Sequence, residues 1–154
     1  MQRRMFLRVA FLASVFLAFC MPALAQRAKP FQGEWHWAIY AKSKDELPPA
    51  YRGERLKDVP GAALYLKLKQ HGNKLTGEYS ASRRFLARLE EGELESIIKG
   101  KTARLELQSG FGGTVTVLLS LHGNRLHWKT IKSEGEYYFP DDVFLSRVVR
   151  RRNR

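Results

Sequence analysis

Apolar and polar residues alternate along more than half of the chain, and this alternation constrains the fold more than any other feature of the sequence. Successive side chains of a β-strand point to opposite faces, so a period of two predicts strands with one buried and one solvated face. Leu64, Leu66 and Leu68, for example, alternate with Lys67 and Lys69. Glycine, asparagine and proline interrupt the alternation at short intervals, which predicts hairpins between the strands.

The alternating segments predict eight strands in sequence. They are expected near residues 32–40, 62–70, 74–81, 92–99, 102–108, 114–121, 125–131 and 142–149. Eight strands close a small barrel, and closure removes the two unpaired edges that an open sheet would expose. The predicted fold class is therefore all-β, an eight-stranded antiparallel up-and-down barrel.

Two segments do not follow the alternation. The segment from Ala41 to Gly61 contains three prolines and many charged side chains, and we expect a lid-like loop with a short helical turn. The segment from Ser82 to Glu91 suits a helical turn or a twisted strand equally well.

A six-residue pattern occurs twice, at residues 70–75 and 121–126, and both copies contain His-Gly-Asn. Gly-Asn supplies the positive φ angles of tight hairpin turns, so both copies predict a hairpin of one type. His71 and His122 are assigned to turn structure and not to a metal site, because the chain has four histidines and one cysteine from which to complete a ligand set.

The N-terminal residues have the pattern of a secretory signal peptide. Basic residues precede an apolar run at residues 9–20, and Ala23-Leu24-Ala25 has the small-x-small form of a cleavage site. The apolar run is shorter than the roughly 20 residues that a transmembrane helix needs. We therefore expect cleavage near Ala25 and a periplasmic or secreted protein, with a signal peptide at 1–25, one barrel domain at 26–149 and a basic tail at 150–154.

The only cysteine, Cys20, lies inside the predicted signal peptide. The residues before it resemble a bacterial lipobox, but Phe19 stands where that motif has a small residue, so cleavage near Ala25 is expected in place of lipidation. The exported domain would then have neither a thiol nor a disulfide.

The chain is strongly basic, with a formal net charge of +12 that falls to +9 when the three arginines of the signal peptide are removed. Such an excess favours anionic partners. The C-terminal arginines could contact an anionic membrane surface or lipopolysaccharide, or could simply be solvated; they are Arg150, Arg151, Arg152 and Arg154. Nucleic acid is not an expected partner, because an exported protein encounters little of it.

The first and last predicted strands carry the residues Gly33-Glu34-Trp35 and Arg147. This pairing resembles the signature of the calycins, which include lipocalins, fatty-acid-binding proteins, avidins and a bacterial metalloprotease inhibitor family. The resemblance implies a structural role for Gly33, Trp35 and Arg147, with the tryptophan closing one barrel end and the arginine lying across its face. The segments 126–128, 135–138 and 140–142 are also similar to small exported proteobacterial proteins, a likeness that implies no activity.

The sequence announces no catalytic site, metal site or cofactor site. Glu34 and His36 are expected on a solvated strand face, and Asp141-Asp142 follows a proline in a turn. The glycine-rich segment 110–113 joins two strands and is not followed by a helix, so it does not have the context of a phosphate-binding loop. We therefore do not expect an enzyme.

Four aromatic residues are the candidates for ligand contact: Trp37, Tyr79, Trp128 and Tyr138. They could line an apolar pocket, but side chains alone can also fill an eight-stranded barrel, and the sequence leaves both alternatives open. The expected function is a monomeric exported binding protein that holds a small apolar or amphipathic ligand in the barrel or at its mouth. The alternative is an inhibitor of an exported or host hydrolase, a protease in preference to a basic lysozyme, because like charges repel.

Overall fold

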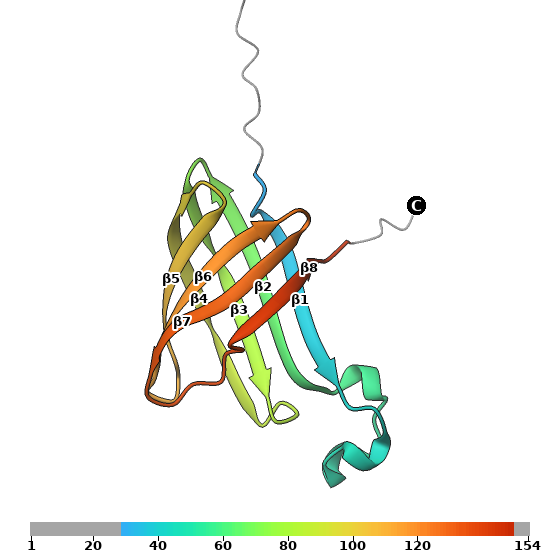
Figure 1. Cartoon of the computed structure of the whole chain (residues 1–154). Helices are drawn as coiled ribbons and strands as arrows, with labels where there is room; N and C mark the ends of the chain where they lie inside the picture. The colour runs from blue at the N-terminus through green and yellow to red at the C-terminus, as the bar shows by residue number, and fades with distance from the viewer. Residues whose placement is uncertain (1–28, 150–154) are drawn as a thin grey trace, which may run out of the picture.

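A computed structural model describes residues 29–149 and places them in a closed antiparallel barrel, in which each strand pairs with its neighbours in sequence (Figure 1). The strands are β1 Gly33–Tyr40, β2 Pro60–His71, β3 Lys74–Arg83, β4 Arg88–Lys99, β5 Thr102–Gln108, β6 Thr114–His122, β7 Arg125–Glu134 and β8 Asp142–Arg147. The predicted fold class is confirmed. The predicted signal peptide and the C-terminal arginines from Arg150 lie outside the described residues.

The hairpin between β3 and β4 resolves the ambiguous segment from Ser82 to Glu91. Both strands extend further than predicted, and the chain reverses through Arg84, Phe85 and Leu86, whose φ angles are 53°, 56° and 68°. A left-handed conformation costs roughly 1–2 kcal/mol for each residue with a Cβ atom. The turn was not predictable as such because it contains no glycine or asparagine, the residues that usually adopt this conformation.

The segment between β1 and β2 contains three short 3₁₀ helices: η1 Lys44–Glu46, η2 Pro49–Tyr51 and η3 Leu56–Asp58. The predicted helical turn is therefore present. Leu47 and Val59 are buried within the segment. In Figure 1 the segment extends away from the barrel beside the ends of β1 and β2, and does not cross the opening as a lid would.

The predicted hairpins with His-Gly-Asn join β2 to β3 and β6 to β7. Gly72 and Gly123 have φ angles of 63° and 62°, so each adopts the conformation for which glycine was expected. Both turns lie at the end of the barrel where β1 begins and β8 ends, which we call the closed end. The opposite end, with the β3–β4, β5–β6 and β7–β8 connections, is called the mouth.

The closed end is sealed by Trp35 and by the residues that precede β1. The Trp35 side chain is fully buried, and its Nε1 donates a hydrogen bond to the carbonyl oxygen of Phe31 at 2.9 Å. Phe31 is also fully buried, and its backbone nitrogen donates to Oε1 of Gln70 on β2 at 3.2 Å. The segment before β1 therefore crosses this end of the barrel. The indole N–H of Trp35 and the backbone N–H of Phe31 are both buried and both hydrogen-bonded.

Arg147 holds this closure from the outside. Its guanidinium carbon lies 4.2 Å from the centroid of the Trp35 ring, the contact that the resemblance to calycins implied. Its Nη2 donates to the carbonyl oxygen of Pro30 at 2.7 Å, and its Nη1 donates to that of Gln32. One side chain thus fastens the end of β8 to the segment before β1.

The seam between β1 and β8 is short. Trp35 pairs with Arg147 and His36 with Ser146, and residues 37–40 of β1 continue towards the mouth outside this pairing. Strands β4 and β5 likewise pair next to their turn, at Ile98 with Ala103 and at Lys99 with Thr102. The sheet therefore diverges at two seams towards the mouth.

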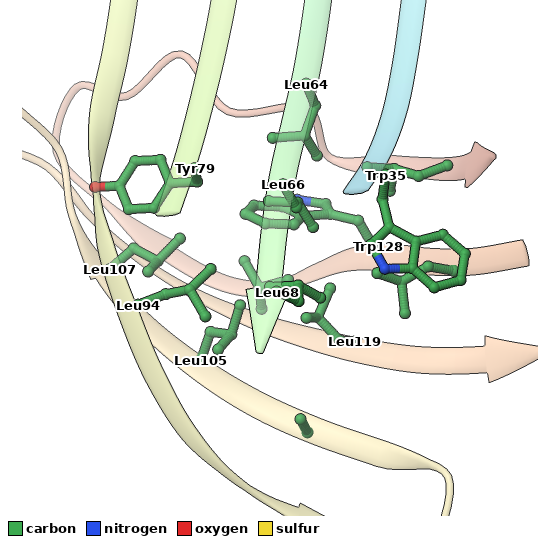
Figure 2. Close-up of a cluster of buried hydrophobic side chains, with 14 of the residues drawn as sticks. Trp35, Leu64, Leu66, Leu68, Tyr79, Leu94, Leu105, Leu107, Leu119 and Trp128 are labelled. Carbon is green, nitrogen blue, oxygen red and sulfur yellow. The ribbon is translucent and has the colours of Figure 1, made fainter. Parts of the chain in front are cut away.

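The interior of the barrel is packed with side chains, several of which are drawn in Figure 2. Leucine, valine and aromatic residues from the alternating positions face one another across it, as the period of two predicted. The largest fully buried side chains include Trp35, Trp128, Phe31 and Phe139. These side chains meet in one continuous core, so the alternative of a barrel filled by its own side chains describes this structure.

Substitution Gly33→Ala should lower the free energy of unfolding by about 2 kcal/mol. Gly33 has a φ of 134°, and a Cβ atom there would overlap Nη1 of Arg147. Chemical denaturation followed by circular dichroism measures the change. Gly53→Ala is the control, because a Cβ there meets nothing within 4 Å, and equal losses in both variants would contradict the assigned role of Gly33.

Candidate functional site

The strand register arranges the inner face of β1 to β4 in three rows that approach the mouth. The rows are Trp35–Leu66–Tyr79–Gly92, then Trp37–Leu64–Ala81–Glu90, then Ile39–Ala62–Arg83–Arg88. Paired residues on neighbouring strands point to the same face, so each row lies at one level of the barrel. The lining changes from apolar to partly charged and finally to cationic as it reaches the mouth.

The connection between β7 and β8, residues 135–141, folds into the mouth, and we call it the mouth loop. Its Phe139 is fully buried and packs against Tyr79, with ring centroids 5.4 Å apart, and against Trp128 at 5.9 Å. Nε1 of Trp128 donates to the carbonyl oxygen of Pro140 at 2.9 Å. Tyr79 and Trp128 therefore point inwards as the alternation predicted, but the mouth loop occupies the space above them.

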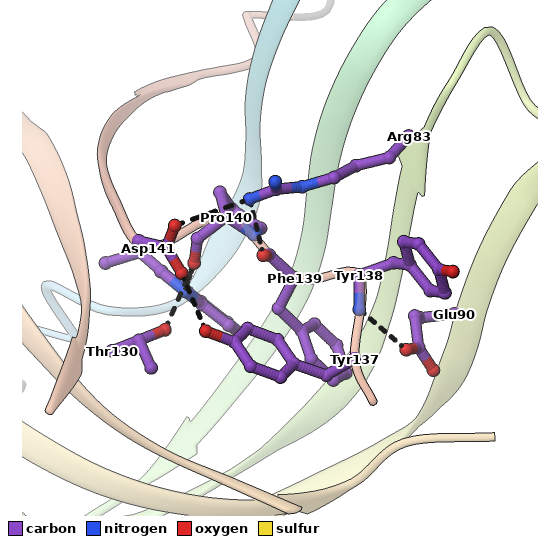
Figure 3. Close-up of polar contacts among 9 residues, drawn as sticks. Arg83, Glu90, Thr130, Tyr137, Tyr138, Phe139, Pro140 and Asp141 are labelled. Carbon is purple, nitrogen blue, oxygen red and sulfur yellow. Dashed lines mark hydrogen bonds and ion pairs between the residues drawn. The ribbon is translucent and has the colours of Figure 1, made fainter. Parts of the chain in front are cut away.

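Polar contacts hold the mouth loop to the walls of the barrel (Figure 3). Nη2 of Arg83 donates to the carbonyl oxygen of Phe139 at 2.8 Å and lies 3.7 Å from Oδ2 of Asp141. The backbone nitrogen of Thr130 on β7 donates to the carbonyl oxygen of Asp141 at 2.7 Å. The loop is thus fixed both to β3 and to β7.

Glu90 is a buried carboxylate that joins three parts of the mouth. Its side chain accepts hydrogen bonds from Oγ of Ser109 at 2.6 Å, from the backbone nitrogen of Gly110 at 3.0 Å and from that of Tyr138 at 3.1 Å. Glu90 lies on the part of β4 that has diverged from β5. Its hydrogen bonds to Ser109 and Gly110 connect β4 to the residues after β5, where backbone hydrogen bonds between the two strands have ended. Charged acceptors form stronger hydrogen bonds than neutral ones, which suits this role.

Sequence reasoning missed Glu90 because it lies in the segment whose conformation was ambiguous. One pattern could have placed its side chain: Glu90 lies an even number of residues from Leu94, a buried residue of the same strand, and such residues share a face. Parity places a side chain on a face, but it does not show that a carboxylate there will be buried with three donors around it.

A surface pocket of about 390 Å³ lies at the mouth. Its lining comes from β1, β2, the β3–β4 hairpin and the mouth loop, namely Trp37, Ile39, Gly61, Ala62, Arg83, Arg84, Tyr137 and Tyr138. The structure therefore brings together two of the four predicted ligand residues, Trp37 and Tyr138. Tyr79 and Trp128 belong to the packed interior and do not line this pocket.

Arginines and aromatic rings meet beside this pocket. Nε of Arg88 donates to the Tyr138 hydroxyl at 3.2 Å, and that hydroxyl donates to the carboxylate of Glu136. The Tyr138 hydroxyl, followed by Glu136, raises the pKa of Arg88. Arg84 lies 5.7 Å from the Tyr138 ring, and Phe111 packs edge-on against the same ring at 4.8 Å.

Two of the residues considered for catalysis, Asp141 and Asp142, contact neighbouring side chains. Oδ1 of Asp142 lies 2.6 Å from Nε2 of His127, and this contact lowers the pKa of Asp142. Asp141 accepts from the Tyr137 hydroxyl at 3.0 Å. Among the described residues, no group of three or more histidine, cysteine, aspartate or glutamate side chains is placed to hold a metal ion.

Comparison with known proteins yields no relative: no protein-family model matches the chain, and no curated protein or solved structure does either. Within residues 29–149, none of the helices has the length and apolar character needed to cross a membrane.

Substitution Glu90→Gln should lower the free energy of unfolding by about 1–3 kcal/mol, because the amide offers one acceptor oxygen to groups that now share a carboxylate. Chemical denaturation measures the loss. Glu93→Gln on the exposed face of β4 is the control and should change stability by less than about 0.5 kcal/mol. A neutral Glu90→Gln would show that the carboxylate does not hold the mouth together.

Tyr79 should make the protein less stable in alkali. Burial, and to a smaller extent the charge of Glu90, raise the pKa of Tyr79, so the folded state favours the neutral phenol. The unfolded chain ionises near the ordinary pKa of about 10, and stability is therefore lost as the pH rises above that value. Unfolding free energies measured across this range should fall less steeply in Tyr79→Phe than in the wild type or in Tyr40→Phe, and parallel curves would contradict the prediction.

Proposed function

We propose that this protein is a non-enzymatic exported binding protein of the calycin type, which holds an amphipathic molecule with an anionic group at the mouth of its barrel. The observation that carries the proposal is the pocket at the mouth, which Trp37 and Ile39 line together with Arg83 and Arg84. Small-molecule sites commonly combine apolar walls with a few placed polar groups.

The packed interior supports binding at the mouth in preference to binding inside. Phe139 occupies the space next to Tyr79 and Trp128, and hydrogen bonds from Arg83 and to Glu90 hold the loop that carries it. A ligand inside the barrel would have to displace this buried side chain. The pocket above it is already open.

Arg84 is the group best suited to an anionic ligand. Arg83 is engaged with the carbonyl oxygen of Phe139 and with Asp141. Arg84, in contrast, lines the pocket, is exposed and has no carboxylate within ion-pair distance in the part of the chain that the structure describes. A guanidinium binds a carboxylate or phosphate through paired hydrogen bonds, while Trp37 and Ile39 would contact an apolar chain.

Tryptophan fluorescence tests the proposal with dodecyl phosphate below its micelle concentration. Trp35 and Trp128 are fully buried, so half-buried Trp37 is the expected reporter. We expect a saturable change with dodecyl phosphate and a weaker one with neutral dodecyl maltoside.

Arg84→Gln should weaken dodecyl phosphate binding about tenfold, because it removes one charge-assisted contact, and should leave maltoside binding unchanged. Arg125→Gln removes the same charge at the closed end and is the matched control. A flat titration, or equal weakening by both substitutions, would overturn the proposal.

A further inference from the structure

The hairpin that joins β3 to β4 ends in an apolar and cationic tip. We call residues 83–89, Arg-Arg-Phe-Leu-Ala-Arg-Leu, the β3–β4 tip; it carries three arginines and no acidic residue. Leu86 is 45% exposed and Leu89 is 48% exposed. Two large apolar side chains are therefore presented to solvent, Leu86 between two arginines and Leu89 next to Arg88.

The backbone of the tip keeps Leu86 exposed. Phe85 is turned back onto β2, where its nitrogen donates to the carbonyl oxygen of Gly61 at 3.3 Å and its ring lies against the same glycine. The left-handed conformation of Arg84, Phe85 and Leu86 places Phe85 inwards and Leu86 outwards. Strain of this kind persists only where surrounding contacts maintain it, and it often marks a functional segment.

The apolar and basic surface continues from the tip onto the β5–β6 turn. Phe111 in that turn is 38% exposed and lies 5.6 Å from the guanidinium carbon of Arg88. Of the acidic groups nearby, Glu136 accepts from the Tyr138 hydroxyl, Glu90 is buried among its own donors, and exposed Glu91 accepts from Oγ of Ser80. Within residues 29–149, neither Arg84 nor Arg88 forms an ion pair with any of these three carboxylates.

We propose that the β3–β4 tip docks this protein on an anionic phospholipid bilayer. Leu86 and Leu89 would enter the boundary between headgroups and acyl chains, while Arg84 and Arg88 would contact phosphates, the distribution expected of a membrane-surface segment. Charge complementarity selects this partner, because Arg84 and Arg88 form no ion pair within the described residues and anionic lipids attract basic residues near the surface.

This docking surface lies at the other end of the barrel from the end of β8. β8 ends at the closed end, whereas the β3–β4 tip lies at the mouth (Figure 1). Docking would turn the mouth pocket towards the bilayer, but it does not depend on a ligand being bound there, so the inference goes beyond the proposed function.

Vesicle flotation tests the docking with the purified protein and vesicles of phosphatidylcholine, with and without phosphatidylglycerol. We expect binding that requires phosphatidylglycerol and weakens with added salt. Arg84→Gln should weaken vesicle binding about fivefold, because it removes the attraction of one basic residue to the anionic lipid surface. Leu86→Ser and Leu89→Ser should each weaken it by about fivefold through lost apolar contact.

Two matched controls lie at the closed end. Arg125→Gln removes one charge, and Ile97→Ser removes an apolar side chain that is 50% exposed on the outer face of β4. Both should bind as the wild type does, and circular dichroism should show every variant folded. Equal weakening by controls and tip variants, or binding lost only on deletion of residues 150–154, would overturn the proposal, as would binding to neither kind of vesicle.

The same variants separate this inference from the ligand proposal. Leu86 does not line the pocket, so Leu86→Ser should retain wild-type affinity for dodecyl phosphate while its vesicle binding weakens. Tip-dependent vesicle binding without amphiphile binding would support docking and refute the ligand site. Amphiphile binding without vesicle binding would support the ligand site and refute docking.

Discussion

The whole structure depends on joining the first strand to the last, and the backbone contributes little to that join. The Arg147 side chain supplies much of the remaining contact between the two ends of the sheet, because its guanidinium covers Trp35 and donates to two carbonyl groups of the segment before β1. Gly33 belongs to the same arrangement, since any side chain there would occupy the place of the guanidinium. The closed end is therefore built from a few residues that are far apart in sequence, and the positions of all the inner rows follow from it.

The structure of the mouth follows from the strand pairing at the closed end. Strands that pair firmly at one end diverge at the other, and the gaps must be covered because unpaired backbone groups and apolar side chains would otherwise meet water. The mouth loop covers them with Phe139, and two oppositely charged groups, Arg83 and Glu90, hold it through its backbone. This arrangement fills the interior and leaves the surface above it as the place for recognition.

Arginines near the mouth serve different purposes although they are neighbours in sequence. Arg83 binds the mouth loop, Arg88 binds Tyr138, and Arg84 faces the pocket. The turn that connects them is strained, and it directs one apolar side chain inwards and the next outwards. The same few residues thereby complete the barrel and form the surface to which we assign ligand and membrane binding.

The sequence by itself determined the eight strands apart from the hairpin between β3 and β4. It also determined the glycine turns and the faces on which Tyr79 and Trp128 lie, because alternation and turn chemistry are local properties of the chain. The resemblance carried by Trp35 and Arg147 also anticipated their contact. Only the tertiary structure decided that Tyr79 and Trp128 would meet Phe139, that Glu90 would be buried and that Trp37 and Tyr138 would share a pocket. These outcomes depend on contacts such as that of Arg83 with Phe139, 56 residues apart, and no local pattern records which distant segments will meet.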